Sequence, residues 1–371
     1  MVDLKSQYEK IKSTINASIQ EVLDTNTYIN GPEVQKFQKN LEEYLDVKHV
    51  IPCANGTDAL QIAMMGLGLK PGDEVITADF TFAATVETIA LLQLTPVLVD
   101  VDLYNMNINI DAIRNAITPK TKAIIPVHLF GRATNMEAIM HIANQHNLFV
   151  IEDNAQAIGA NCKFSDGTKK KAGTIGHVGA TSFFPSKNLG CYGDGGAIFT
   201  NDNILAHTLR GIVNHGMYER YHHDVVGVNS RLDSIQAAVL NAKLPLLDQY
   251  GKARQDAARK YSAAFEGHKN IVAPIICDVC DCHVFHQYTL RIINADRNGL
   301  MQYLLDLGIP CAIYYPIPLH LQKAYLDVRY KEKDFPVTNQ LVKEVLSLPM
   351  HTELDDEQIK FITDSVLEFL R

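Results

Sequence analysis

The stretch Leu148-Phe-Val-Ile-Glu-Asp153 is an apolar, partly β-branched run that ends in two acidic residues. Four other runs of this kind occur earlier in the chain, at residues 49–54, 74–77, 96–101 and 123–127. Short apolar runs separated by helix-like segments are typical of βα units around a buried, largely parallel sheet. We therefore predict an α/β fold whose main sheet contains these strands.

A glycine-rich turn within residues 176–200 is flanked by two further strand-like runs. We expect these runs to be neighbouring strands of the same sheet, joined by a functional loop. The segment 234–266 is rich in Ala, Leu, Lys and Gln, which favour a helix. We expect it to lead the chain out of the first domain.

The C-terminal part of the chain has fewer strand-like runs, at 287–292 and 310–315, and ends in two predicted helices. This pattern predicts a smaller α+β domain. A length of 371 residues also suits about two domains. We predict a large domain over residues 1–245 and a small domain over residues 246–371.

The composition is that of a globular protein, and it excludes disordered, collagen-like and coiled-coil chains. There are 34 Lys and Arg against 42 Asp and Glu, a formal net charge of −8, whereas proteins that bind nucleic acid or anionic lipid are normally basic. The sequence has no secretory signal pattern and no run near the roughly 18 apolar residues of a spanning helix. Since the seven cysteines are an odd number, we expect them to be reduced. We predict a cytoplasmic protein that binds neither nucleic acid nor membrane.

Residues 53–61 run from a predicted strand into a predicted helix. Free backbone N–H groups at a helix start, beside the Thr57 hydroxyl and the bare Gly56, make a candidate cradle for one phosphate. The alternative is an ordinary helix capped by Thr57 or Asp58. Nucleotide-binding motifs are poorly supported, because the glycines at 66–72 have the wrong spacing and no P-loop motif occurs.

Asp153 falls at the carboxyl end of a predicted strand, where ligands bind in open α/β sheets. Its carboxylate is either a helix cap or the partner of a cationic group on a ligand. Gln156, three residues later, either closes a capping box or hydrogen-bonds a ligand oxygen.

Lys187 follows an apolar strand and precedes four glycines between Gly190 and Gly196. Glycine occurs where the backbone turns tightly or approaches a ligand closely. Most lone lysines are solvated surface charges. The segment after Lys187 is rich in glycine and carries few side chains. A buried amine with a lowered pKa, suited to imine chemistry, is therefore an equal alternative for Lys187.

Together these segments supply a phosphate cradle, a carboxylate for a pyridinium nitrogen and an amine for a covalent imine. Those are the three groups that hold pyridoxal phosphate, which we predict as the cofactor. Phe80, after the predicted strand at 74–77, would lie flat on the cofactor ring or, alternatively, belong to the core.

At these residues the sequence resembles the DegT/DnrJ/StrS family of nucleotide-sugar aminotransferases. The segments Ala54-Asn-Gly-Thr-Asp-Ala-Leu, Glu152-Asp-Asn-Ala-Gln and Ser182-Phe-Phe-Pro-Ser-Lys keep the family's spacing, and the resemblance extends over essentially the whole chain. It implies the aspartate aminotransferase fold, fold type I, with a large cofactor domain and a smaller α+β domain.

The resemblance implies a role for each matching residue. Lys187 would bind the cofactor covalently and, once displaced, move the proton between the donor's α-carbon and the cofactor. Asp153 would keep the ring nitrogen protonated, and Gln156 would face the ring oxygen.

The same resemblance implies how the cofactor phosphate is held. Gly56, Thr57 and Ser182 of one subunit would bind it, together with Asn229 from the neighbouring subunit. A homodimer with shared active sites follows from this arrangement.

The family reaction has two halves: L-glutamate leaves its amine on the cofactor, and a keto-sugar attached to a nucleotide collects it. The segment Cys191-Tyr-Gly-Asp-Gly-Gly is similar to enzymes that aminate C3. Among these the chain most resembles aminotransferases for UDP-2-acetamido-2-deoxy-3-oxo-glucuronate, which suggests the synthesis of surface polysaccharide such as O-antigen. Arg231 would pair with the carboxylate of the sugar or of glutamate, or else form a structural ion pair.

Four further residues are predicted to contact the substrate. Many family members have His-Tyr-Pro where this chain has Tyr314-Tyr-Pro, so the phenol of Tyr314, beside Tyr315, replaces an imidazole. His222 and His223 belong to a polar segment that either reaches the substrate or stays in solvent.

Other functions stay open at this point. A C3 or C4 aminotransferase for another dTDP-, UDP- or GDP-linked keto-sugar fits the same motifs. A pyridoxal-phosphate-dependent sugar dehydratase fits less well, because relatives of that kind carry histidine in place of Lys187. A non-catalytic regulator would keep the fold without turnover.

A cysteine cluster invites a metal interpretation. Cys277, Cys280 and Cys282 precede His283 and His286, and thiolates and imidazoles at short spacing can bind zinc. No second pair follows at zinc-finger distance, so we expect no metal site.

Overall fold

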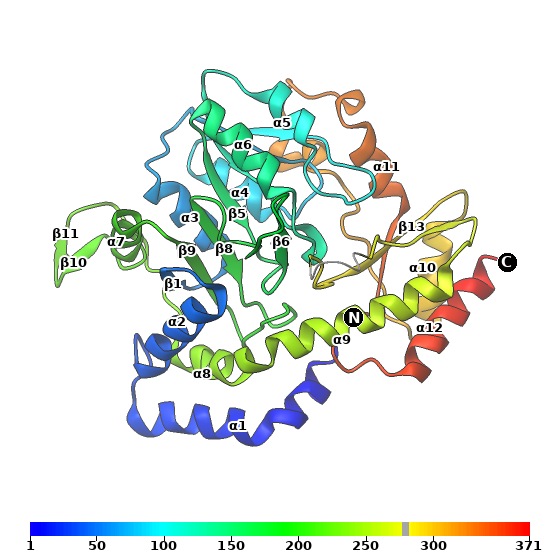
Figure 1. Ribbon diagram of the computed structural model, residues 1–371, viewed down its shortest axis with the longest axis horizontal. Coiled ribbons are helices and arrows are strands. Elements are labelled where there is room, and N and C mark those ends of the chain that lie inside the picture. The colour runs from blue at the N-terminus through cyan, green and yellow to red at the C-terminus, as the bar shows by residue number, and fades with distance from the viewer. Residues whose placement is uncertain (277–281) are drawn as a thin grey trace.

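The computed structural model describes residues 1–276 and 282–371, and its centre is a seven-stranded sheet (Figure 1). Across the sheet the strands are β1 (His49–Cys53), β9 (Gly196–Thr200), β8 (Val178–Ser182), β5 (Phe149–Asp153), β4 (Thr121–Ile125), β2 (Glu74–Ala78) and β3 (Thr95–Val99). β9 is antiparallel to both its neighbours, and the other pairs are parallel. The predicted α/β fold is confirmed, including the neighbouring strands on either side of the glycine-rich turn.

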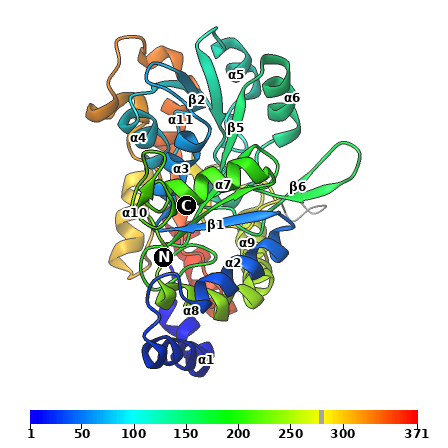
Figure 2. The ribbon, with the colours of Figure 1, turned by 90° about the vertical axis from the view of Figure 1, so that its left-hand side faces the viewer.

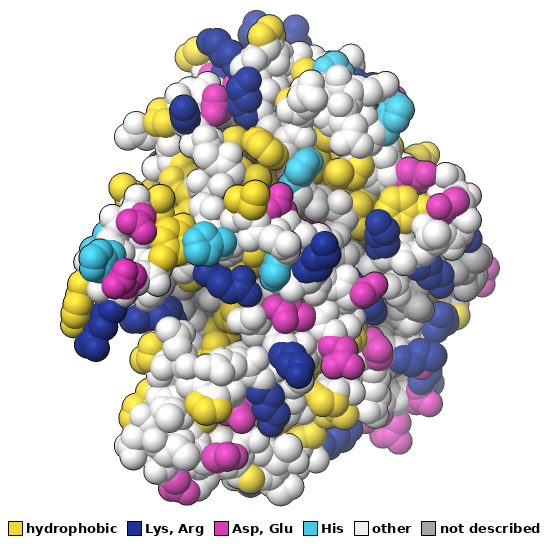
Figure 3. All heavy atoms as spheres, turned by 60° about the vertical axis from the view of Figure 1, so that its left-hand side comes forward, with side chains coloured by type: hydrophobic (Ala, Val, Ile, Leu, Met, Phe, Trp, Pro, Cys, Tyr) yellow, Lys and Arg dark blue, Asp and Glu magenta, His cyan; other side chains and the backbone are white. Residues whose placement is uncertain are grey.

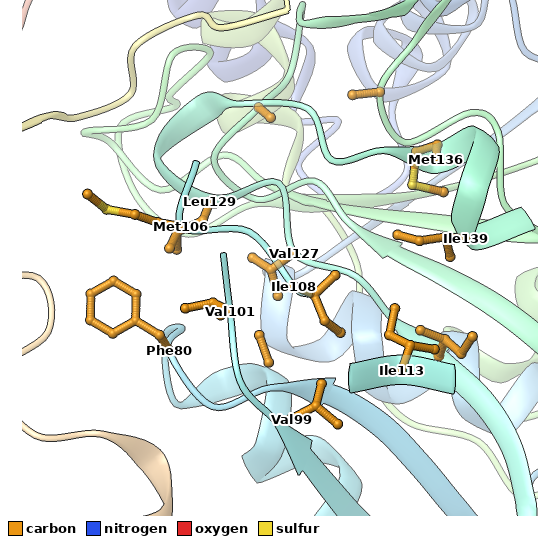
Figure 4. Packing of buried hydrophobic residues seen from close by; sticks show 14 of the residues in the cluster. Phe80, Val99, Val101, Met106, Ile108, Ile113, Val127, Leu129, Met136 and Ile139 are labelled. Carbon is orange, nitrogen blue, oxygen red and sulfur yellow. The ribbon is translucent and has the colours of Figure 1, made fainter. Parts of the chain in front are cut away.

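Both faces of this sheet are buried, because its strands alternate between two hydrophobic clusters. In β5, Val150 packs into one cluster and Ile151 into the other, as the two-residue period of a strand requires. Figure 4 shows the first cluster. The covering helices are α5 (Ile110–Ala116) and α6 (Met136–His146) on the first cluster, and α3 (Gly56–Gly66), α4 (Ala84–Leu91) and α7 (Asn203–Ile212) on the second.

Further helices cover the end of the sheet formed by β1 and β9. α2 (Pro32–Leu45) and α8 (Ser234–Lys243) pack there around Phe37 and Phe183, whose ring centroids lie 5.3 Å apart. α1 (Leu4–Thr25) packs along α8, and Figures 1 and 2 both place it at the bottom of the molecule.

α9 (Leu247–Phe265) connects this region with the C-terminal one. Its first residue packs among the residues of α2 and α8, and its last packs in a separate C-terminal cluster. The elements of that region are β12 (Ile271–Val272), β13 (Tyr288–Ile292) and β14 (Val345–Leu348), which form an antiparallel sheet, and α10 (Arg297–Asp306), α11 (Pro336–Glu344) and α12 (Asp356–Phe369). The smaller α+β region is confirmed, while the boundary between residues 245 and 246 stays a prediction.

One expectation for the C-terminal region, the strand at 310–315, is wrong. The run at 310–315 forms no strand and pairs through one isolated bridge, between Ala312 and Ser347. β13 pairs instead with β14, which the sequence analysis missed. The two predicted closing helices are confirmed as α11 and α12, whereas α10, between the two predicted runs, was not predicted.

Two hairpins stand apart from the main sheet. The first is β6 (Asn161–Lys163) with β7 (Lys169–Lys171). The second is β10 (Met217–Glu219) with β11 (His222–His223), which lies at the left of Figure 1. Short 3₁₀ helices are η1 (Leu129–Gly131), η2 (Leu244–Leu246), η3 (Leu319–Leu321), η4 (Lys323–Tyr325) and η5 (Glu332–Asp334). Cys277 and Cys280, the pair considered for zinc, lie outside the described residues. No helix within residues 1–276 and 282–371 is long and apolar enough to cross a membrane.

Candidate active site

A cavity of about 860 Å³ opens beside the carboxyl ends of the central strands. One wall comes from the end of β5, the start of α3 and the loop after β8, and the opposite wall comes from the C-terminal region. Ligands bind at this edge in α/β sheets. The predicted site residues that line the cavity are Gly56, Thr57, Asp153, Gln156, Ser182, Lys187, Tyr314 and Tyr315.

Asp153 presents a buried carboxylate to this cavity. Its Oδ2 accepts a hydrogen bond from Thr85 Oγ1 at 2.8 Å, and its Oδ1 accepts one from the Ala155 N–H at 3.2 Å. Burial raises the pKa of Asp153, while these hydrogen bonds and the nearby Lys187 charge oppose the rise. No helix follows Asp153, so the helix-cap alternative is wrong.

The neighbouring Glu152 fixes the end of β5. Its carboxylate accepts three backbone N–H groups within residues 173–176, at 2.6 to 2.8 Å, and lies 2.9 Å from His128 Nε2. The Thr134 N–H donates to His128 Nδ1, so the ring proton lies on Nε2 and points at Glu152. This buried network fixes the backbone at the end of β5, from which Asp153 projects.

Lys187 lies in the loop between β8 and β9, and its backbone N–H donates to the Phe184 carbonyl at 2.8 Å. Burial lowers the pKa of Lys187 to about 8, and the Asp153 charge opposes that change. Its Nζ makes no hydrogen bond with any residue that the structure describes. Such an amine is partly neutral near neutral pH and can attack a carbonyl carbon, so the solvated-surface alternative is wrong.

The N-cap of α3 is Asn55, and not Thr57 or Asp58. Asn55 Oδ1 accepts the Asp58 N–H at 2.8 Å. The N–H groups of Gly56 and Thr57 therefore have no partner within the helix. A Cβ on Gly56 would lie 2.6 Å from Ser182 Cβ, so the bare glycine lets Ser182 approach. These groups fit one phosphate at a helix start.

Gln156 bridges two parts of the cavity wall. Its Oε1 accepts the Phe130 N–H at 2.6 Å, and its Nε2 donates to the Tyr315 hydroxyl at 3.1 Å. Burial raises the pKa of Tyr315, so the phenol stays protonated. No helix begins here, and the capping-box alternative for Gln156 is wrong.

The prediction that Phe80 lies flat on the cofactor ring is wrong. Phe80 is 1% exposed and packs in the first hydrophobic cluster (Figure 4). Its ring meets that of Phe130 edge-on, with the centroids 6.4 Å apart. Phe82 lines the cavity instead and is 56% exposed. The chain has left β2 at this point, so the period of a strand does not fix which aromatic faces the cavity.

His222 and His223 do not line the cavity of their own chain. They form β11 of the exposed hairpin, and His223 Nδ1 lies 2.9 Å from the His215 carbonyl. In one chain both imidazoles therefore face solvent, and their contact with substrate stays a prediction.

Asn229 and Arg231 also lie outside this cavity. Asn229 is exposed, and the Ser230 hydroxyl beside it accepts the Ala54 N–H at 3.0 Å, next to the start of α3. Arg231 forms no ion pair with any described residue of its own chain, so the structural ion-pair alternative is not seen there.

His286 is a cavity residue that the sequence analysis placed only in a metal interpretation. It is 6% exposed, and its Nδ1 is buried without a hydrogen-bond partner among the described residues. Burial, with Lys187 and Arg254 nearby, holds the pKa of His286 well below its usual value. The imidazole is therefore neutral. Neither His286 nor Thr85, the donor to Asp153, belongs to a recognisable sequence motif.

The cavity of one chain has more acidic than basic side chains. Asp58, Asp153 and Asp194 line it, and Lys187 is the one Lys or Arg among its described lining residues. An anionic ligand is therefore held by backbone N–H groups and hydroxyls, or by groups from outside this chain.

These residues fit pyridoxal phosphate. The start of α3 suits the phosphate, Asp153 suits a pyridinium N–H, and the Lys187 amine suits the aldehyde. Thr81 Oγ1 lines the cavity and is buried with no partner among the described residues, which leaves a hydroxyl for a bound group. When bound, the cofactor supplies an electron sink for chemistry at an amine-bearing carbon.

Sequence comparison places the chain among sugar aminotransferases. The sequence matches the profile of the DegT/DnrJ/EryC1/StrS aminotransferase family over residues 9–367. It is 47% identical over 361 residues to the UDP-2-acetamido-2-deoxy-3-oxo-D-glucuronate aminotransferase of Pseudomonas aeruginosa PAO1, which covers 97% of each chain. It is 44% identical over 359 residues to the UDP-N-acetyl-3-dehydro-alpha-D-glucosamine 3-aminotransferase of Acidithiobacillus ferrooxidans, which covers 97% of this chain and 94% of the relative.

Comparison of folds agrees. A DegT DnrJ EryC1 StrS aminotransferase from Brucella abortus superposes with a TM-score of 0.93 at 44% identity, over 99% of this chain and 98% of the other. A solved neighbour from Bacillus subtilis, with a TM-score of 0.89 at 30% identity over 97% of this chain and 82% of the other, holds the cofactor as pyridoxamine phosphate. The chain therefore belongs to the DegT/DnrJ/EryC1/StrS family and is a pyridoxal-phosphate-dependent sugar aminotransferase of fold type I.

Proposed function

We propose that this enzyme transfers the amine of L-glutamate to C3 of UDP-2-acetamido-2-deoxy-3-oxo-glucuronate. The observation that carries the proposal is the 47% identity, over 97% of both chains, to the P. aeruginosa aminotransferase that acts on this sugar. The relative that is 44% identical also aminates C3 of a UDP-sugar, so the two agree on carbon and nucleotide. The step would serve surface polysaccharide synthesis, such as that of O-antigen, in the cytoplasm.

Lys187 is the residue we assign to binding the cofactor and moving the proton. A pKa of about 8 leaves the amine able both to accept and to return a proton near neutral pH. It would take the proton from the α-carbon of glutamate and, in the second half, deliver one to C3 of the sugar.

Asp153, Gln156 and Phe82 are assigned to holding the cofactor ring. The Asp153 carboxylate would keep a positive charge at the ring nitrogen, and Gln156, together with Tyr315, would face the ring oxygen. Phe82 offers an exposed ring at the cavity wall. The groups at the start of α3 and Ser182 would bind the phosphate.

We also propose a homodimer with shared active sites. Asn229 is exposed and Arg231 half-buried outside the cavity of their own chain, and that cavity has an acidic excess, although the substrate carries a diphosphate and carboxylates. Cationic and anionic side chains are interspersed on the face drawn in Figure 3, so no continuous basic patch there attracts the substrate. Donors from a second subunit would complete the site.

A second candidate is an acceptor without the C6 carboxylate, as in the A. ferrooxidans relative. No arginine occurs among the described residues that line the cavity of one chain. A variant of Arg231, which lies outside that cavity, distinguishes between the two acceptors. If Arg231 pairs with the uronate, Arg231→Ala weakens use of the uronate acceptor about 10- to 100-fold and leaves the glucosamine-type acceptor unchanged.

One experiment tests the reaction. The protein is incubated with pyridoxal phosphate and glutamate while the absorbance of the aldehyde form of the cofactor converts to that of the amine form. Each UDP-3-keto-sugar is then added, and the product is identified by mass spectrometry. Lys187→Ala is the control and converts nothing. No conversion by wild type with glutamate contradicts the donor, and a higher kcat/KM for the glucosamine-type sugar favours the second candidate.

A further inference from the structure

A buried hydrogen-bonded pair outside the reaction centre joins the main sheet to the C-terminal region. Asp79 directly follows β2 and is 0% exposed, and His320 in η3 is 4% exposed. Asp79 Oδ1 accepts the backbone N–H of His320 at 2.7 Å, and Oδ2 accepts its ring Nδ1–H at 2.7 Å. The Asp79 carbonyl accepts the Leu319 N–H at 3.2 Å. One residue thus binds two consecutive residues through three hydrogen bonds.

The imidazole is also fixed on its ring face. The His320 ring stacks on Phe335 with a centroid separation of 4.4 Å and an interplanar angle of 18°. Phe335 meets Tyr330 edge-on, and the Tyr330 hydroxyl accepts the Leu98 N–H of β3 at 2.8 Å. The segment that carries His320 is therefore held against β2 and β3.

Both partners lie close in sequence to residues that line the cavity, on two segments that meet there. Phe82 follows Asp79 by three residues, and Tyr315 and Pro316 shortly precede His320. All three line the cavity, and the rings of Phe82 and Tyr315 lie 6.2 Å apart. A shift between Asp79 and His320 would therefore change the spacing of the two walls.

We propose that Asp79 and His320 form a clamp that fixes the spacing between Phe82 and the Tyr315–Pro316 wall, and that they are positioning residues for the sugar acceptor. The inference deepens the proposed function and rests on it, because the nucleotide-sugar is the substrate large enough to meet both walls. Glutamate is smaller and depends less on their spacing. Water cannot substitute for either partner, since both are buried.

Asp100 is a matched control in the same region. Its carboxylate accepts the N–H groups of Val337 at 2.8 Å and Thr338 at 2.9 Å, and the Thr338 hydroxyl at 2.7 Å. It is not among the described residues that line the cavity. Its loss loosens the contact between β3 and α11 without altering a cavity wall.

The test compares wild type with three variants. His320→Phe keeps a ring on Phe335 but removes the donor to Asp79 Oδ2. His320→Asn returns an N–H near the position of Nδ1, and Asp100→Asn is the control. The rate of the glutamate half-reaction, the KM for the keto-sugar and the visible circular dichroism of the cofactor-loaded enzyme are measured for each.

We expect His320→Phe to raise the acceptor KM about 10-fold or more, a larger change than that in the rate of the glutamate half-reaction measured at saturating cofactor. The circular dichroism of the cofactor band changes too, because Phe82 and Tyr315 flank the site. His320→Asn restores most of both signals, and Asp100→Asn lowers thermal stability without moving either.

Parallel losses in both half-reactions for His320→Phe and Asp100→Asn would show a structural role only and overturn the clamp. An unchanged cofactor band in His320→Phe would overturn it as well, whichever sugar is the acceptor. If wild type aminates no keto-sugar, the proposed function fails. The clamp is then tested only by the circular dichroism of the cofactor band.

Discussion

At Lys187 two opposing effects set the chemistry of one amine. Burial among the residues of the loop after β8 disfavours the ammonium, and the Asp153 carboxylate favours it. The lysine therefore has a pKa of about 8, between that of a surface lysine and that of a fully isolated buried one. The glycines around Lys187 indicated a special position, but the sequence could not give the pKa, because it depends on a carboxylate from another strand.

This balance predicts how the amine reacts in the cofactor-free protein. Only the neutral amine attacks an acylating reagent, so labelling of Lys187 by acetic anhydride should rise with pH through an inflection near 8. Asp153→Asn removes the charge that raises the pKa of Lys187, and the inflection should move to lower pH. Mass spectrometry of the Lys187 peptide, with exposed Lys5 as internal reference, measures both. An inflection that coincides with that of Lys5, or moves upward in Asp153→Asn, contradicts this account.

Phe80 and Phe82 form a matched pair for the ring-binding role. Phe80→Leu should lower the free energy of unfolding by about 1 to 3 kcal/mol, because it leaves a void in a packed cluster, and should change cofactor affinity little. Phe82→Leu should do the reverse and weaken cofactor binding about 3- to 10-fold through loss of an aromatic contact. Chemical denaturation of the cofactor-free protein and fluorescence titration with pyridoxal phosphate separate the two. If Phe80→Leu weakens the affinity more than Phe82→Leu, the sequence-based assignment was right.

Among the helices and strands, the sequence predicted best the strands that are buried on both faces. The strands of the main sheet are buried on both faces, so each is a continuous apolar run that stands out from its helical neighbours. The run at 310–315 has strand-like residues, yet Tyr314 and Tyr315 turn into the cavity, and tertiary contacts override the local preference. β14 was missed because Val345-Leu-Ser-Leu directly follows α11 with no turn residue between them.

The start of α3 was placed correctly and its cap was not, because the capping residue Asn55 lies one position before the glycine. Gly56→Ala tests what this helix start does. The added methyl would meet Ser182 Cβ at 2.6 Å and push Ser182 away from the free N–H groups. We expect a loss of about 10-fold or more in affinity for pyridoxal phosphate.

Gly251→Ala is the control for that variant. Gly251 lies in α9, where an added methyl meets nothing closer than Val284 at 4.0 Å. This change should leave cofactor affinity unchanged and raise the stability slightly, because alanine favours a helix. If fluorescence titration gives equal affinities for both variants and wild type, the cofactor phosphate does not bind at the start of α3.

For the whole molecule, the cavity is composite even within one chain. Its walls come from the main sheet and from the C-terminal region, which α9 and the Asp79–His320 pair join. The sequence indicated two regions and a net charge of −8. It could not show that Lys187 is the one cationic lysine or arginine among the described residues that line the cavity, since that depends on where Arg231 lies in space.

Mixed dimers test where the missing donors come from. If Asn229 serves the site of the neighbouring subunit, a dimer of one Lys187→Ala and one Asn229→Ala subunit has one site with both defects and one intact site. Random mixing in equal amounts makes half of the dimers mixed, so activity should return to about a quarter of wild type. The two parent variants are assayed separately as controls. If Asn229 serves its own chain, every lysine-containing site carries the Asn229 defect, and mixing restores nothing beyond the Asn229→Ala parent.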